Sequence, residues 1–172
     1  MSKNKFLLLF VSCALIPIIA AKVSLSLGWF KGGDTNKGVW LEHDFPLIRV
    51  ESSSAPHWYL AYVQGDTCTI ECEYSLYILQ QLYSGLGRKQ MGLQPLLVAT
   101  VQPPQLTEYP ALKWRSASVE STEVKGQILL LNQQGIAILR YLPTTIPGQI
   151  PALARDIRSD LLRLMNYDRS SM

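Results

Sequence analysis

The chain has 172 residues, of which 48% are hydrophobic and 17% are charged. This composition excludes a disordered chain and a polytopic membrane protein, and the length suits one compact domain with a sizeable core. The net charge of +3, without a dense run of Lys and Arg, excludes the basic surface typical of nucleic-acid-binding proteins.

Residues 1–30 are predicted to be a membrane anchor. Lys3 and Lys5 precede an uncharged apolar run, which Lys22 interrupts before apolar and aromatic residues continue. A cleaved signal peptide is one interpretation of this pattern, because a pair of alanines follows the run. An uncleaved transmembrane helix from Phe6 to about Leu27 is favoured, since it has roughly the 20 residues that a bilayer requires.

A polar segment, residues 31–54, is predicted to connect this anchor to a folded domain over residues 55–172. It contains a turn cluster of Gly, Asp, Thr and Asn, and a loop of three serines. Residues 40–41 and 47–50 are predicted to form short edge strands within it.

The folded domain begins with a predicted central strand over residues 58–64, which is rich in aromatic and β-branched side chains. A helix is predicted from Cys68 to about Gly85, with Asp66 or Thr67 as the N-cap candidate. Its spacing places these residues close to one face: Cys72, Leu76, Leu79, Leu82 and Leu86.

The rest of the chain predicts a buried strand at residues 93–101 and an irregular connector at 102–125 with a short helix from Gln105. A hairpin follows, with strands at 128–131 and 136–141, and a final helix begins near residue 150. The element order, β-α-β followed by β-β-α, predicts an α/β domain with a mixed sheet and helices on both faces.

Cys68 and Cys72 stand where the central strand gives way to the first helix of the domain. They are the only cysteines outside the apolar segment, where Cys13 is interpreted as a packing residue, so they pair arithmetically. Such a pair is a redox couple, a soft-metal site or a structural disulfide. The possibility of a disulfide favours an extracytoplasmic space for the domain.

The groups near this pair shift the pKa of a thiol in opposite directions. The free N–H groups and dipole of a helix N-terminus lower the pKa of a thiol, whereas nearby carboxylates raise it. Asp66, Glu71 and Glu73 lie close in sequence. These acidic flanks disfavour a strongly oxidising disulfide and favour a bound cation, and thiolates select soft metals such as Cu(I).

Neither histidine offers a strong third ligand. His57 begins the central strand, so an extended strand separates it from the cysteines by on the order of 20 Å, and it is interpreted as a surface residue. His43 lies between two acidic residues in the connecting segment and is the weak candidate for a third metal ligand.

With these elements placed, the chain resembles the thioredoxin-like superfamily. It looks most similar to small membrane-anchored proteobacterial proteins encoded with cytochrome c oxidase assembly genes. The resemblance runs nearly end to end. It rests on these segments: Leu27-Gly28-Trp29, Thr35-Asn36-Lys37-Gly38, Cys68 and Cys72 with Leu76-Tyr77 and Gln80-Gln81, Leu86-Gly87-Arg88, Leu131-Asn132-Gln133-Gln134-Gly135, and Asp160-Leu161-Leu162-Arg163-Leu164-Met165.

The CxxxC spacing also resembles Sco-type copper chaperones, whose copper site uses two cysteines and a histidine. Cys68 and Cys72 match that pair. The stretch that matches the histidine loop, residues 121–126, contains no histidine, and Thr69 stands where those proteins have a proline. This stretch also lacks the proline that precedes the hairpin in thioredoxins.

The resemblance implies a single-pass protein of a bacterial inner membrane whose thioredoxin-like domain faces the periplasm. It would assist assembly of a respiratory oxidase, by handling copper or thiols at Cys68 and Cys72, with oxidase subunits or assembly factors as partners. One alternative is a non-catalytic scaffold with a structural disulfide that binds partner proteins. A second alternative, the enzymatic one, is a thiol-disulfide oxidoreductase.

Overall fold

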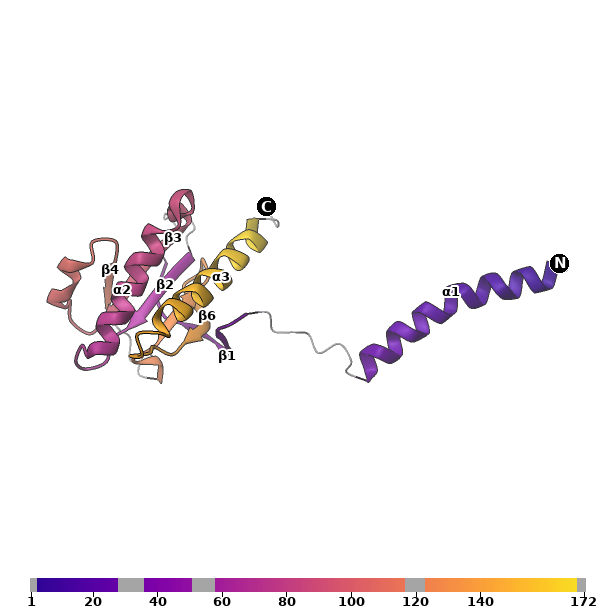
Figure 1. Cartoon of the computed structure of the whole chain (residues 1–172), viewed down its shortest axis with the longest axis horizontal. Helices are drawn as coiled ribbons and strands as arrows, with labels where there is room; N and C mark the ends of the chain where they lie inside the picture. Colours follow the sequence, from indigo (N-terminus) through magenta and orange to yellow (C-terminus); the bar gives the residue numbers. More distant parts are fainter. Residues whose placement is uncertain (1–2, 28–35, 51–57, 117–122, 170–172) are drawn as a thin grey trace. The chain divides into compact units, whose positions relative to one another are not determined.

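The computed structural model describes residues 3–27, 36–50, 58–116 and 123–169. The chain forms two compact units, Met1–Thr35 and Asn36–Met172 (Figure 1). The first unit contains helix α1, Lys3–Ser26, which has Pro17 in its interior. Within the described ranges, no helix combines the length and the apolarity that a membrane crossing requires, so the predicted transmembrane helix is not confirmed.

The second unit is built on a six-stranded sheet with the order β1-β6-β5-β2-β3-β4. β2 pairs in parallel with β3, and β3 with β4, whereas the other neighbours are antiparallel. The predicted mixed sheet is therefore confirmed. Its strands are β1 Val39–Pro46, β2 Trp58–Val63, β3 Leu93–Ala99, β4 Lys113–Ser116, β5 Ile128–Leu131 and β6 Ile136–Tyr141.

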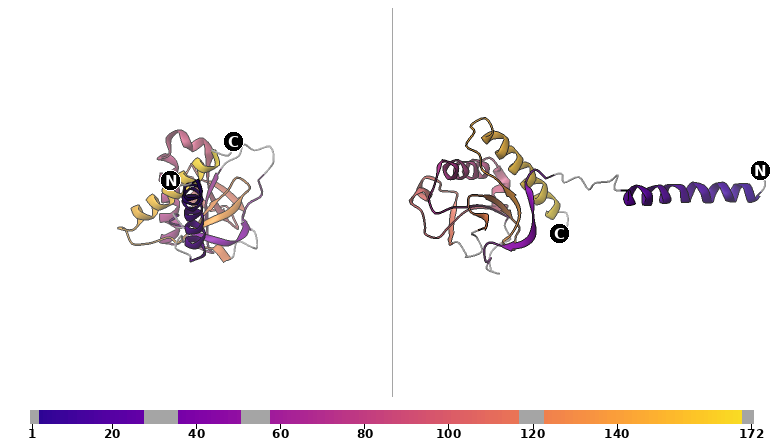
Figure 2. Two further views of the ribbon diagram at one scale, coloured as in Figure 1. Left: turned by 90° about the vertical axis from the view of Figure 1, so that its right-hand side faces the viewer. Right: turned by 90° about the horizontal axis from the view of Figure 1, so that it is seen from below.

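Two α-helices flank this sheet, α2 (Ile70–Ser84) and α3 (Ile150–Arg169), and two 3-10 turns, η1 (Gly87–Gly92) and η2 (Pro104–Glu108), lie in its connections. Both α-helices cover the same face (Figure 2), where their apolar side chains join one core cluster. The opposite face carries a second cluster with no α-helical member among the described residues. Flanking helices are confirmed, but the prediction that they cover both faces is wrong for the part of the chain described.

The predicted linker, residues 31–54, differs from its prediction where the structure describes it. β1 spans residues 39–46 and is an edge strand, which includes the predicted strand at 40–41. Residues 47–50 form no strand, although Leu47 is buried against the second cluster. The domain therefore uses part of the predicted linker as a component of its sheet.

The prediction also missed β4, which lies in the connector described as irregular. Its four residues, Lys-Trp-Arg-Ser, are mostly exposed because β4 forms the other edge of the sheet. An edge strand with charged side chains has no apolar run to reveal it in the sequence. The remaining predicted elements, β2, α2, β3, the β5–β6 hairpin and α3, are present.

Candidate functional site

The site begins where β2 ends in the middle of the sheet. All six residues of β2 are buried, between β5 on one side and β3 on the other. The backbone N–H of Gln64 donates to Val98 O at 2.8 Å, which extends the pairing one residue beyond the strand. The chain then turns into α2, so the turn follows a strand whose residues are all buried.

Thr69 is the N-cap of α2. Its backbone is extended, with φ −91° and ψ 179°, and its carbonyl accepts the first helical hydrogen bond from the N–H of Glu73 at 3.1 Å. The predictions of Asp66 or Thr67 as the cap are wrong. Cys68 consequently lies just before the helix rather than in its first turn, whereas Cys72 is the third helical residue.

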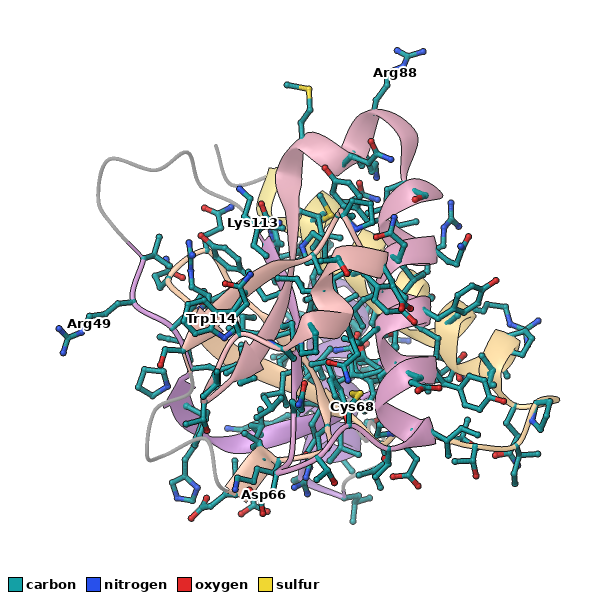
Figure 3. All side chains as sticks on the ribbon, turned by 90° about the vertical axis from the view of Figure 1, so that its left-hand side faces the viewer. Arg49, Asp66, Cys68, Arg88, Lys113 and Trp114 are labelled. Atoms are coloured by element: carbon teal, nitrogen blue, oxygen red, sulfur yellow. A yellow bond between two sulfur atoms is a disulfide. The ribbon has the colours of Figure 1, made fainter. Side chains whose placement is uncertain are left out.

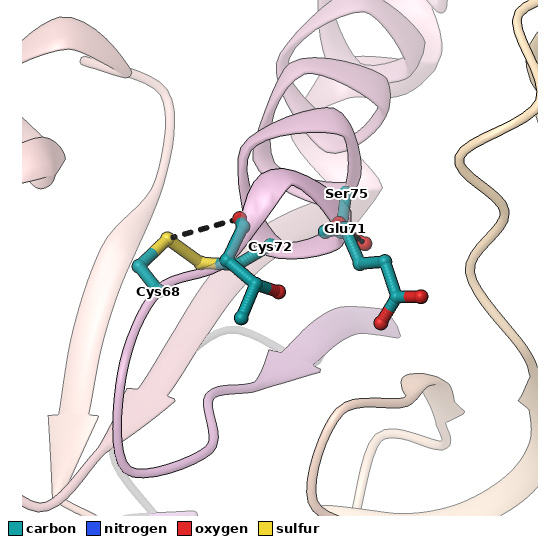
Figure 4. The surroundings of a disulfide bond; sticks show 5 residues. Cys68, Glu71, Cys72 and Ser75 are labelled. Carbon is teal, nitrogen blue, oxygen red and sulfur yellow. Dashed lines mark hydrogen bonds between the residues drawn. A yellow bond between two sulfur atoms is a disulfide. The ribbon is translucent and has the colours of Figure 1, made fainter.

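The two cysteines form a disulfide with their Cα atoms 5.2 Å apart (Figure 4). Cys72 is 1% exposed and belongs to the core cluster beneath α2. Cys68 is partly buried and packs against the margin of that cluster. The arrangement places one sulfur in the interior and leaves the other within reach of the surface.

Charged groups surround the turn that carries Cys68. Asp66 accepts a hydrogen bond from the ammonium of Lys125 at 2.9 Å, and this ion pair joins the β2–α2 turn to the segment before β5. The hydrogen bond and charge of Lys125 hold the pKa of Asp66 below its usual value. Figure 3 shows Asp66 and Cys68 at the end of the domain opposite Arg88.

Two tyrosines near α2 have raised pKa values, because they are buried and because carboxylates lie nearby, including those of the first turn of α2. Burial and the charge of Glu71 raise the pKa of Tyr62 to about 12. Burial, followed by the charges of Glu108 and Glu73, raises the pKa of Tyr109. The carboxylates predicted to flank the cysteine pair are thus present at the start of α2, where both glutamates are exposed.

The one histidine in the described ranges, His43, does not lie beside the cysteine pair. His43 is exposed on β1, three strands away from β2, which corresponds to about 14 Å across the sheet. His57 lies outside the described residues. Within the described ranges, no group of three or more His, Cys, Asp or Glu side chains is placed to hold a metal ion, and Cys13 is a free, exposed cysteine on α1.

A depression beside the cysteine turn was not anticipated from the sequence. It has a volume of about 410 Å³ and lies at the carboxyl ends of β2 and β3. Its walls come from residues 64–66 and 99–104, two segments more than 30 residues apart. The signal that was available is that both segments follow parallel strands, whose carboxyl ends meet at one edge of a sheet.

The chain matches no family model and no curated protein. Its second unit is similar to solved structures, including the apo Sco1 protein from Thermus thermophilus. That structure is 17% identical, with a TM-score of 0.53, over 76% of this chain and 97% of the other. The domain has the thioredoxin-like fold.

Two further solved structures share this likeness at lower scores. Copper-bound ScoI from Arabidopsis thaliana is 15% identical over 70% of this chain and 98% of the other, with a TM-score of 0.47. A SCO1/SenC family lipoprotein from Bacillus anthracis is 12% identical over 64% and 82%, with a TM-score of 0.46. In this thioredoxin-like domain, Cys68 and Cys72 occupy the junction between a central strand and the helix that follows it.

Proposed function

We propose that the Cys68–Cys72 pair is a reversible thiol–disulfide site which, when reduced, binds Cu(I) for assembly of a respiratory oxidase. The observation that carries this proposal is the asymmetry of the pair, with Cys72 in the core and Cys68 at the margin of the surface. A purely structural bridge does not require access to either sulfur. A thiol that exchanges or accepts a metal ion does require it.

The donor set defines which copper chemistry the pair supports. Reduction would give two thiolates four residues apart, and thiolates favour Cu(I) over harder cations. In the part of the chain that the structure describes, no third ligand lies with them, so the pair fits a two-coordinate Cu(I) ion. Copper is the cargo in this proposal, and His43 as a third ligand stays a prediction from the sequence.

A competition experiment tests the proposal. The full chain is reduced and loaded with Cu(I), and the metal it retains is measured against increasing concentrations of a Cu(I) chelator. Retention is expected at one Cu(I) per chain, and it should disappear in the Cys68→Ser/Cys72→Ser variant. Cys13→Ser is the matched control and should retain the metal. Equal retention by the native chain and the double variant contradicts copper handling.

The second candidate is a non-catalytic scaffold in which the disulfide only stabilises the fold. The burial of Cys72 favours it, because a buried sulfur is protected from exchange. The reduction potential distinguishes the two: a structural bridge lies below about −300 mV, whereas a working couple is less negative. A less negative potential, together with turnover of a model disulfide, would instead favour a thiol-disulfide oxidoreductase.

The same pair supports the proposed cellular setting. A disulfide persists in an oxidising compartment, which supports a periplasmic location for the second unit. Attachment to a bacterial inner membrane and partnership with oxidase subunits are parts of the proposal that rest on the sequence resemblance. Alkylation of the cysteines in intact cells, with and without prior reduction, would test the compartment.

A further inference from the structure

A buried carboxylate on α3 holds the two residues that lead into β1. Asp160, on α3, is fully buried. Its Oδ2 accepts hydrogen bonds from the backbone N–H of Lys37 at 2.7 Å and of Gly38 at 2.9 Å, and from the hydroxyl of Tyr141 at 2.9 Å. Burying a charge is costly unless it is well hydrogen-bonded. Two of these three donors, the N–H groups of Lys37 and Gly38, are lost if β1 leaves with the residues before it, whereas Tyr141 on β6 remains.

The close packing of Gly38 makes this contact possible. A Cβ on Gly38 would lie 2.6 Å from two ring carbons of Tyr141, so a larger residue would displace the backbone or the ring. Tyr141 in turn is 4% exposed, and burial together with the charge of Asp160 raises its pKa. The segment that leads into β1 thus meets β6 and α3 at one point, through Gly38, Tyr141 and Asp160.

Beyond this point, β1 pairs with the sheet along one side only. It is an edge strand, and its register with β6 is interrupted between Trp40 and Phe45. Its last residue is Pro46, which has no N–H to donate. Val39 and Trp40 remain 57% and 40% exposed. The strand is held by two short paired stretches, by the packing of Leu41 and Phe45 against the second cluster, and by the contact of the preceding residues to Asp160.

We propose that β1 is a releasable strap, which stays on the sheet while Asp160 keeps its hydrogen bonds to the N–H groups of Lys37 and Gly38. When these hydrogen bonds break, residues 37–46 leave β6 while the other five strands and both helices of the domain stay folded. Release exposes the edge of β6, and an unpaired edge pairs readily with another extended chain. Lys37 follows the first unit almost directly. A force applied to the chain through that unit therefore loads the hydrogen bonds to Asp160 before it loads the paired residues of β1.

Hydrogen exchange of the full chain, followed by mass spectrometry or NMR, tests this proposal. In Asp160→Asn, amide exchange over residues 37–46 is expected to accelerate by about 10-fold or more, the effect of weakening hydrogen bonds to a charged group. Exchange in β2, β3 and β5 should change less than about 2-fold, as for local opening. Tyr141→Phe removes one donor and should give a smaller acceleration in the same segment. Asp156→Asn, a change of the same kind on the same helix, should give none.

Two results would overturn the strap. Equal acceleration in all strands would mean that Asp160 only stabilises the whole domain, and no acceleration over residues 37–46 would mean that it holds nothing there. Tyr141→Phe decides by the same comparison if Asp160→Asn does not fold, because the loss of one hydroxyl leaves the ring packing in place.

Discussion

Cys72 is buried against the sheet, whereas Cys68, joined to it by the disulfide, is only partly buried in the turn before α2. The difference arises because the helix starts at Ile70, with Thr69 as its cap. Cys72 then faces the core from the first turn, and Cys68 stays outside the helix. Any reagent, partner thiol or metal ion reaches the pair through Cys68.

Alkylation of the reduced chain should therefore be unequal. Cys68 is expected to react with iodoacetamide on the order of 10-fold or more faster than Cys72, because Cys72 must await local opening of α2. Mass spectrometry of the peptides after brief alkylation measures both rates. In urea, the two rates should become similar. Equal rates in the native chain would contradict the asymmetry on which the proposed function depends.

The core beneath α2 should be sensitive to loss of volume. Leu79 has no exposed surface and packs in the cluster between α2 and the sheet. Leu79→Ala is expected to lower the free energy of unfolding by about 2–5 kcal/mol, measured by urea denaturation. Met91→Ala is the control, since Met91 is 85% exposed and its loss should change stability by less than about 0.5 kcal/mol. Similar losses in both variants would show that α2 is not packed as described.

The sequence predicted the elements that bury apolar side chains in a regular period. The strands at 58–63 and 128–131 are wholly buried and the strand at 136–141 buries alternate residues, so their apolar patterns identified them. β4 is a four-residue edge strand with exposed Lys113 and Arg115, and it left no such pattern. That no α-helix in the described ranges covers the second face was equally hidden, because periodicity shows that a strand is buried but not which element covers it.

Stability should fall at alkaline pH through Tyr62. Its pKa is 10 in the unfolded chain and about 12 in the fold, so the native state retains a proton that the unfolded state loses. This contribution is fully present below pH 10 and is lost as the pH rises through about 12. The loss amounts to about 2.7 kcal/mol at most. Urea unfolding of Tyr62→Phe at pH 9 and pH 11 should show a smaller decrease than the native chain. An identical decrease would assign the alkaline loss to other groups.

Of the candidate site, the sequence predicted the cysteine pair and its acidic neighbours, because these lie within a few residues of one another. It could not predict that Lys125 pairs with Asp66, since the two are 59 residues apart and only the sheet brings them together. The difference between Cys68 and Cys72 was also hidden, because it depends on where the helix cap falls.

The turn of the β5–β6 hairpin should depend on Gly135. Gly135 has φ +81°, and a Cβ there would overlap the carbonyl oxygen of Ile48. Its own carbonyl accepts hydrogen bonds from the N–H groups of Leu47 at 3.1 Å and Ile48 at 3.4 Å. Gly135→Ala is expected to lower the free energy of unfolding by about 1–3 kcal/mol, measured by urea denaturation.

Gly148→Ala is the matched control for this turn. A Cβ added to Gly148 would meet no atom within 4 Å, and its φ is not positive, so this substitution should change stability by less than about 0.5 kcal/mol. Because Gly135 touches the segment that follows β1, its variant should also accelerate amide exchange at Leu47 and Ile48. A variant that loses stability without any change at these two amides would place the strain within the hairpin alone.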